Sequence, residues 1–397
     1  MGMKIAIVSQ HLNGRSGHSR QALELASYLS RMGISSCVIS INPTDLTAFS
    51  TSTPHSECAE KPSHDPLLCL NEKVGLWSHK RKEVEDVDLI HCFDISSAIA
   101  MKRYCQKRIR RRIPIVVSVT STINLAPRDL LDAGPLSVLN LHRLVHVLKL
   151  IVPPCLTSYQ LNGFDSVLCY SSFIRRHLLS SGVESDKVTR IGYGIDPTNL
   201  PQPQVDSRNS RVKLLYLGWG SSLRGTNDAL DAFLLAQSQG FGGTLRFEIV
   251  GSHTVEEKLI VSNILESMRD HRSIRLNVGY NSRIRDAIAD SDAVLLPFRS
   301  VYGYCHPPLS LLEPMLLGKP VISTQIGSIP EFVEHARTGL LAACHDIEGI
   351  AECISALASP QARDRIGQAG KYETMKVTDW GIISNHLLSC YEKVSRH

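Results

Sequence analysis

The chain has 397 residues, of which 43% are hydrophobic and 20% are charged, and its formal net charge is +5 at pH 7. This length allows two globular domains, and the composition excludes a fibrous, collagen-like or disordered protein. The charge is small for the length, so it gives no general signal for nucleic-acid binding, and we expect no nucleic-acid partner.

The cysteines and the first residues bear on the cellular compartment. Eleven cysteines occur without a CxxC pair, mostly within apolar runs such as 35–41 and 165–172. This pattern favours packed, reduced thiols over a disulfide framework. The first twelve residues turn polar too early for a signal peptide, and no apolar run of about 18 residues occurs. We therefore expect a cytoplasmic protein, soluble or at most peripheral to the inner face of the membrane.

Short β-branched runs alternate with longer helical patterns along the chain, which is typical of parallel sheets covered by helices on both faces. The predicted strands are 4–9, 36–41, 88–93, 114–120, 213–218, 245–251, 273–279, 292–298 and 319–324. Residues 196–211 are rich in Pro, Asn, Asp and Ser and are predicted to form a linker. The fold class is therefore α/β, with two doubly wound Rossmann-like domains. A ligand is expected at the carboxyl ends of the strands, in the cleft between the domains.

Three segments do not fit this alternation. Residues 42–66 are polar and rich in Pro, Ser and Thr, which predicts a long loop. Residues 102–112 carry seven basic side chains. A solvated helix face is the preferred interpretation, and docking on an anionic membrane or an acidic acceptor is the alternative. Residues 139–154 have apolar side chains at helical spacing, which fits a peripheral helix or ordinary burial.

Glycine-rich turns follow the first strand of each half, within 13–29 and 217–233. A strand that leads through such a turn into a helix directs unpaired N–H groups at an anion. Neither turn is a dinucleotide fingerprint, because Leu223 stands where a third glycine is needed, and a nicotinamide dehydrogenase is disfavoured. Arg224, beside the second turn, is suited to binding phosphate through two N–H groups.

The most specific stretch is 309–342, which reads LSLLEPMLLGKPVISTQIGSIPEFVEHARTGLLA, and it is supported by 16–33, 170–196 and 379–394. In order and spacing these segments resemble the retaining glycosyltransferases of family 4, which have the GT-B architecture. The resemblance runs over most of the chain.

The resemblance implies transfer of a sugar from a nucleotide diphosphate sugar to an unidentified acceptor, with the anomeric configuration kept and with no metal or other cofactor. It implies an acceptor-side domain at 1–195, the linker at 196–211 and a donor domain at 212–376. Residues 377–397 would form a helix that crosses back to the first domain.

Residue roles follow from the same resemblance. Glu313 matches the second glutamate of the E-x7-E motif, which holds the ribose hydroxyls, and the catalytic set is Thr120, Arg224 and Glu313. The amides of Leu309 and Ser310 fall where the family contacts the diphosphate. The implied donor-binding set is Gly17, Gly218, Trp219, Arg224, Cys305, His306, Leu309, Ser310 and Glu313. The acceptor-side candidates are His18 and His91, and His91 is equally open to a structural role.

Three positions depart from the family pattern. Cys305 replaces the first glutamate of E-x7-E, Trp219 replaces a phosphate-binding arginine, and Thr120 replaces a histidine beside the sugar. The cations that are candidates to compensate for Trp219 are Arg15, Arg20 and Arg299.

The residues directly before the helix predicted at the start of 309–342 are also expected to contribute to the site. Pro307 and Pro308 pre-set the backbone for the first helical turn, leaving later amides to meet the diphosphate. Cys305 and His306 would then face the sugar, with ordinary loop packing as the alternative. The DSD run at 290–292 resembles a metal-binding carboxylate pair, but capping at a helix-to-strand junction is the preferred interpretation.

These departures leave three function classes open. The first is an active retaining glycosyltransferase. The second is a pseudo-glycosyltransferase on the same fold, either catalytically silent or coupling non-sugar groups. The third is a sugar-nucleotide epimerase.

Overall fold

The computed structural model describes residues 3–10, 17–41, 55–56, 84–109, 111–123, 154–201, 211–251, 254–302 and 304–396. The segment predicted at 139–154 lies almost entirely outside these residues. The chain divides into two compact units. The first comprises Met1–Thr120, Pro154–Ile195 and Thr378–His397, and the second comprises Ser121–Pro153 and Asp196–Val377. This division differs from the predicted domains at 121–153, most of which is not described.

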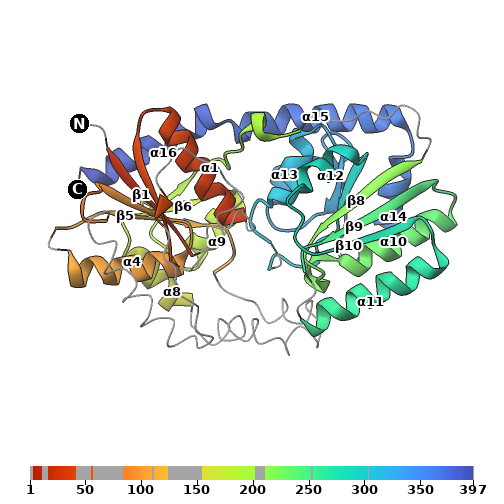
Figure 1. Ribbon diagram of the computed structural model, residues 1–397, viewed down its shortest axis with the longest axis horizontal. Coiled ribbons are helices and arrows are strands. Elements are labelled where there is room, and N and C mark those ends of the chain that lie inside the picture. Colours follow the sequence, from red (N-terminus) through yellow and green to blue (C-terminus); the bar gives the residue numbers. More distant parts are fainter. Residues whose placement is uncertain are drawn as a thin grey trace. The chain divides into compact units, whose positions relative to one another are not determined.

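The first unit contains a parallel sheet with the strand order β3-β2-β1-β4-β5-β6-β7. Its strands are β1 (Lys4–Ser9), β2 (Ser35–Ser40), β3 (His55–Ser56), β4 (Leu89–Cys92), β5 (Ile115–Val119), β6 (Ser166–Cys169) and β7 (Val188–Arg190). Helices cover both faces of the sheet, as Figure 1 shows. They are α1 (Gly17–Arg31), α4 (Ile95–Arg108), α8 (Pro154–Asn162), α9 (Ser172–Ser180) and α16 (Trp380–Ser395).

The second unit contains a parallel sheet with the order β10-β9-β8-β11-β12-β13. Its strands are β8 (Val212–Gly218), β9 (Gly243–Ile249), β10 (Ile274–Val278), β11 (Ala293–Leu296), β12 (Val321–Thr324) and β13 (Leu340–Ala342). Its helices are α10 (Thr226–Ser238), α11 (Val255–Asp270), α12 (Ile284–Asp290), α13 (Leu309–Leu316), α14 (Ile347–Ala356) and α15 (Pro360–Thr378).

Alternation along β8 shows how the second sheet is buried on both sides. Leu214 and Tyr216 belong to one hydrophobic cluster, whereas Leu215 and Leu217 belong to another. Successive side chains of a strand point to opposite faces, so the two clusters lie on opposite faces of the sheet. The predicted α/β class with two doubly wound halves is confirmed.

All nine predicted strands are present, with bounds within two residues of the prediction. The four strands that were not predicted are β3, β6, β7 and β13. β3, β7 and β13 are only two or three residues long, which is too short to show a clear pattern. β3 corrects the prediction that 42–66 is only a loop, because His55 pairs with Val38 of β2.

The C-terminal helix α16 packs within the first unit. Asp379 caps it by accepting a hydrogen bond from the amide of Ile382 at 3.0 Å. Trp380 stacks on Tyr28 of α1 with ring centroids 5.3 Å apart. Near the other end of the helix, the Sγ of Cys390 lies 3.3 Å from the Oγ of Ser166 at the start of β6. None of the helices among the described residues is both long enough and apolar enough to cross a membrane.

Candidate functional site

The turn after β8 has a shape that only glycine permits at two places. Gly218 has φ 146°, and a Cβ there would lie 3.0 Å from an Nη of Arg224. Gly225 has φ 66°, and a Cβ there would lie 1.8 Å from the carbonyl oxygen of Pro297. These positive φ angles and close approaches require glycine. The consequence is that the guanidinium of Arg224 lies directly against the backbone at the carboxyl end of β8.

Arg224 is a half-buried cation, and its guanidinium carbon lies 5.8 Å from the centre of the Phe298 ring. Burial lowers its pKa from the ordinary value, while Tyr216, Cys305 and Tyr304 act in the opposite direction. An arginine side chain stays charged under all ordinary conditions. Within the described part of the chain, Arg224 makes no side-chain hydrogen bond or ion pair. It is therefore a desolvated positive charge suited to an external anion.

The start of α13 supplies backbone donors in the same unit. The amides of Leu311 and Leu312 donate to the carbonyl of Pro308, at 3.0 and 3.3 Å. The amides of Leu309 and Ser310 make no backbone hydrogen bond within the described residues, and both residues are half-buried. Free first-turn amides and the helix dipole together favour an anion. Pro308 has ψ 136° and is the N-cap, so it directly precedes the first turn of α13.

Glu313 is in the middle of α13 and is only 2% exposed. Its Oε1 accepts a hydrogen bond from the Nε of Arg285 in α12, at 2.9 Å. This charge-assisted hydrogen bond fixes the direction of the buried carboxyl group. Sequence reasoning missed Arg285, because the two residues are 28 positions apart and no motif links them.

His306 is fully buried. Its Nδ1 lies 3.1 Å from the Oγ of Ser328, and its Nε2 lies 2.8 Å from the carbonyl oxygen of Val301. Both ring nitrogens are therefore used in fixing the loop. The prediction that the His306 side chain faces a sugar is wrong, and the alternative of loop packing holds. Cys305 beside it is half-buried.

Trp219 stands at the position of the family arginine. Trp219 is 44% exposed, and its carbonyl oxygen accepts a hydrogen bond from the Tyr216 hydroxyl at 3.1 Å. Arg299, a predicted substitute, donates from Nε to the buried Asp228 at 2.7 Å and also pairs through Nη2. Arg299 is thus neutralised by Asp228 and does not fill the role, which corrects that prediction. Arg15 lies outside the described residues.

In the first unit, two predicted residues lie at the carboxyl edge of the sheet. Gly17 begins α1, and its carbonyl oxygen accepts a hydrogen bond from the Tyr193 hydroxyl at 3.3 Å. Thr120 directly follows β5 and is buried. The side chain of His18 lies outside what the structure describes. The catalytic roles of these residues stay predictions.

His91 has a structural role instead of the predicted acceptor-side one. It is fully buried in β4, with its Nδ1 2.6 Å from the Tyr391 hydroxyl and its Nε2 2.8 Å from the Ser118 hydroxyl. The Ser118 hydroxyl lies 2.6 Å from that of Tyr170, which extends the buried network. Burial lowers the pKa of His91 from 6.5 to about 3, so its ring is neutral at physiological pH.

The carboxylates at 290–292 also have internal partners. The Oδ2 of Asp292 accepts a hydrogen bond from the amide of Lys213 at 2.7 Å, and the Nζ of Lys213 donates to Asp290 at 3.1 Å. The run therefore fixes the start of β8 against the helix-to-strand junction. Across the residues that the structure describes, no group of three or more His, Cys, Asp or Glu side chains could hold a metal ion.

Two family models match the chain over most of its length. Residues 15–199 match the model described as Glycosyltransferase Family 4, and residues 211–359 match the model described as Glycosyl transferases group 1. Together with the two parallel sheets, these matches define the class: the chain belongs to the group 1 and family 4 glycosyltransferases of the GT-B fold.

Among curated relatives, the glycogen synthase of Mycobacterium tuberculosis is 27% identical over 217 residues, which is 53% of this chain and 49% of the relative. The alpha-maltose-1-phosphate synthase of Mycolicibacterium smegmatis is 32% identical over 253 residues, which is 58% of this chain and 64% of the relative. The chain thus matches about half the length of the first of these relatives.

Solved structures agree on the fold. Alr3699/HepE of Anabaena, in complex with UDP and glucose, aligns with a TM-score of 0.74 at 17% identity and covers 98% of both chains. Sucrose-phosphate synthase of Thermosynechococcus elongatus aligns with a TM-score of 0.76 at 16% identity and covers 99% of both chains.

Proposed function

We propose that the protein is a retaining, metal-independent glycosyltransferase that moves a sugar from a nucleotide diphosphate sugar to an acceptor of unidentified chemistry. The observation that carries this proposal is the uncompensated guanidinium of Arg224 in the same unit as the free amides of Leu309 and Ser310. Cys305 and Tyr304, shortly before these amides, are close enough to Arg224 to affect its pKa.

The chemistry follows from where charge develops. As the nucleoside diphosphate leaves, negative charge grows on its outer phosphate. Arg224 and the amides of α13 would stabilise this charge without reorganising, because they are already positioned and partly desolvated. Glu313, held in place by Arg285, would accept hydrogen bonds from the two ribose hydroxyls. Gly17, Gly218 and Thr120 complete the proposed set.

A uridine nucleotide is the first donor to test, because HepE of Anabaena was solved with UDP-glucose. Purified protein would be heated with and without UDP and a panel of sugar nucleotides, since a ligand that binds only the folded state raises the melting temperature. Arg224→Met should lose the stabilisation. The matched control is Arg272→Met, an exposed arginine of the same unit.

Turnover with the stabilising donor would then be followed by NMR. Retention predicts the same anomeric configuration in product and donor, and metal independence predicts no loss of rate with EDTA. An inverted product would overturn the retaining mechanism. Interconversion of the free sugar nucleotide would favour an epimerase.

The second candidate is a pseudo-glycosyltransferase. It is favoured by the exposed Trp219 at the arginine position and by the engagement of Arg299 with Asp228, which leave one phosphate cation fewer. Nucleotide binding without transfer or hydrolysis for any acceptor would support it.

The location is part of the proposal: cytoplasmic, with segment 102–112 contacting an anionic membrane surface. Not all of the segment is available for this. Arg111 donates to the carbonyl of Glu85 at 3.0 Å, and Arg112 pairs with Asp165. Arg103, Lys107 and Arg108 are exposed.

A further inference from the structure

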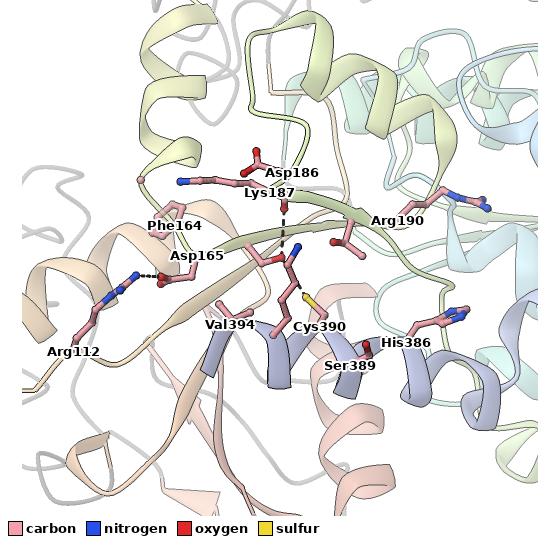
Figure 2. A pocket seen from close by; sticks show the side chains of 14 residues that line it. Arg112, Phe164, Asp165, Asp186, Lys187, Arg190, His386, Ser389, Cys390 and Val394 are labelled. Atoms are coloured by element: carbon pink, nitrogen blue, oxygen red, sulfur yellow. Dashed lines mark hydrogen bonds and ion pairs between the residues drawn. The ribbon is translucent and has the colours of Figure 1, made fainter. Parts of the chain in front are cut away.

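Three adjoining cavities open on the first unit, far along the chain from the donor residues. Their volumes are about 650, 460 and 370 Å³, and all three are lined by Gly163 and Phe164. Figure 2 shows the largest, between the residues that precede β6, the edge strand β7 and α16. The lining segments around 112, 163–166 and 186–187 precede β5, β6 and β7. The cavities therefore lie at the amino-terminal edge of the sheet, opposite the edge that carries Thr120.

The charge around these cavities is strongly biased. Seven Lys or Arg side chains line them, against three Asp or Glu, whereas the whole chain has a net charge of only +5. The basic residues are Lys102, Arg103, Arg111, Arg112, Lys187, Arg190 and Lys393. Most of the chain's excess positive charge is thus concentrated on one face, which we call the amino-edge face.

Some of these cations build the face and others are available. The Nζ of Lys102 donates to the carbonyl of Gly163 at 2.6 Å and lies 5.4 Å from the centre of the Phe164 ring. In contrast, Arg103, Arg190 and Lys393 are exposed and make no hydrogen bond or ion pair with the described residues. These three can pair with external anions without breaking an internal contact.

The arrangement of the charges favours an extended anionic surface over a single small anion. In Figure 2 the side chains of Lys187 and Arg190 extend away from each other, at opposite sides of the cavity. Charges that diverge along a rim cannot all contact one phosphate group. Lys187 is already bonded to the carbonyl oxygen of Asn162 and paired with Glu184, so it is Arg190, with the exposed Arg103 and Lys393, that can contact separate headgroups of a lipid layer.

Exposed apolar side chains lie beside these cations. Helix α8 contains no charged residue, and it exposes 48% of Leu156 and 77% of Tyr159. Tyr159 lines the same cavity as Lys102 and Arg103. Amphipathic aromatic rings favour the headgroup level of a bilayer, and neighbouring Lys and Arg side chains are attracted to anionic lipids. A nucleic acid or an acidic protein surface would not need this combination.

We infer that the amino-edge face binds the surface of a membrane containing anionic phospholipids, with Leu156 and Tyr159 inserting at the headgroup level. This inference deepens the membrane contact proposed for segment 102–112 and extends it to α8, β7 and α16. Docking through this edge leaves the opposite edge of the sheet, with Gly17 and Thr120, away from the lipid.

The test is flotation of the full chain with vesicles of phosphatidylcholine, with or without phosphatidylglycerol, at low and high salt. Wild-type protein should float only with the anionic vesicles, and less at high salt because screening weakens the attraction. The charge variant replaces three exposed side chains of the face, Arg103→Gln, Arg190→Gln and Lys393→Gln, together with the exposed Lys107→Gln of the adjoining segment 102–112. Each lost charge should weaken binding about fivefold, and the four together on the order of several hundredfold.

The matched control removes the same charge from exposed positions of α11 and its surroundings in the second unit: Lys258→Gln, Arg269→Gln, Arg272→Gln and Arg275→Gln. It should bind vesicles within a few fold of wild type. Equal losses in the two variants would overturn the inference, because the effect would then be one of net charge alone. Wild-type binding to poly(U) but not to anionic vesicles would overturn it too.

The apolar part is tested by Leu156→Ser with Tyr159→Ser, against Val255→Ser with Leu265→Ser, which removes exposed apolar side chains from α11. Only the first pair should weaken flotation, and equal effects would contradict insertion through α8.

Thermal stabilisation by UDP is measured on every variant. If wild type floats but UDP does not stabilise it, the donor site is refuted and the membrane inference stands. If UDP stabilises wild type but the protein does not float, only the membrane inference is refuted.

Discussion

Polar side chains near the carboxyl edges of the two sheets differ in whether they have internal hydrogen-bond or ion-pair partners. In the second unit, the Arg224 guanidinium lies over the Phe298 ring but makes no hydrogen bond or ion pair with the described residues, and the amides of Leu309 and Ser310 make no backbone hydrogen bond with them. In the first unit, His91 is bonded to Tyr391 and Ser118 and is fully buried. A suitable residue type at the end of a strand is therefore not sufficient to predict a binding group. Both ring nitrogens of His91 are already occupied by internal partners, whereas the donors of Arg224 are not.

The largest effect is expected on turnover when Arg224, the proposed donor-binding cation of the second unit, is replaced. Arg224→Met should lower turnover by more than 100-fold, a loss of about 3 kcal/mol of transition-state stabilisation, because the charge on the leaving diphosphate loses its cation. Steady-state kinetics with the donor found by thermal shift provide the measurement. Turnover within a few fold of wild type would show that Arg224 is not the phosphate cation.

The next largest effect is on the free energy of unfolding, where breaking a buried ion pair is compared with breaking an exposed one in the same unit. Arg285→Met leaves the carboxylate of Glu313 buried without its cation and should lower the free energy of unfolding by about 2–3 kcal/mol. Arg283→Met breaks the exposed pair with Asp286 and should cost less than about 0.5 kcal/mol. Urea denaturation measures both. Equal costs would mean that the Arg285 pair contributes no more than a surface contact.

The third effect tests the structural role of His91. Because its folded pKa is about 3 against 6.5 unfolded, the unfolded state gains a proton first as the pH falls. Stability from this group is complete above pH 6.5 and is lost between pH 6.5 and 3 by about 1.4 kcal/mol per pH unit. His91→Gln should therefore show a flatter decline of the free energy of unfolding between pH 6.5 and 5, by about 2 kcal/mol. Parallel pH profiles for the two proteins would be inconsistent with a buried, neutral imidazole.

The smallest effect concerns the position where the family cation is missing. Trp219→Arg places a guanidinium at the end of β8, where the tryptophan is 44% exposed. Because solvent screens such a site, we expect a gain of about 1 kcal/mol in UDP binding, roughly fivefold. Trp219→Gln serves as the uncharged control. A weaker affinity in the arginine variant than in the glutamine variant would place residue 219 away from the diphosphate.

Sequence reasoning predicted the fold better than the site. Eight of the nine predicted strands were readable as apolar runs that contain Val or Ile, and the ninth, 213–218, is a leucine-rich run without a β-branched residue. The glycine turns were readable because glycine is favoured where the backbone adopts positive φ angles, as at Gly218 and Gly225. The strands β7 and β13 were missed because they are only three residues long.

The errors at the site have a common physical cause. The role of His306 is decided by Val301 and Ser328, that of Arg299 by Asp228, and that of His91 by Tyr391, 300 residues along the chain. Such partners come from other elements of the fold, and no local pattern contains them. The pairing of Glu313 with Arg285 was missed for the same reason.

The most direct test of the central claim is calorimetric titration of UDP and of uridine into wild type and Arg224→Met. UDP should bind wild type, and the variant should bind UDP at least 100-fold more weakly. Any affinity for uridine should be the same in both proteins, because Arg224 is proposed to contact only phosphate. Equal UDP affinities in the two proteins would contradict the assignment of the donor diphosphate to Arg224 and the entrance of α13.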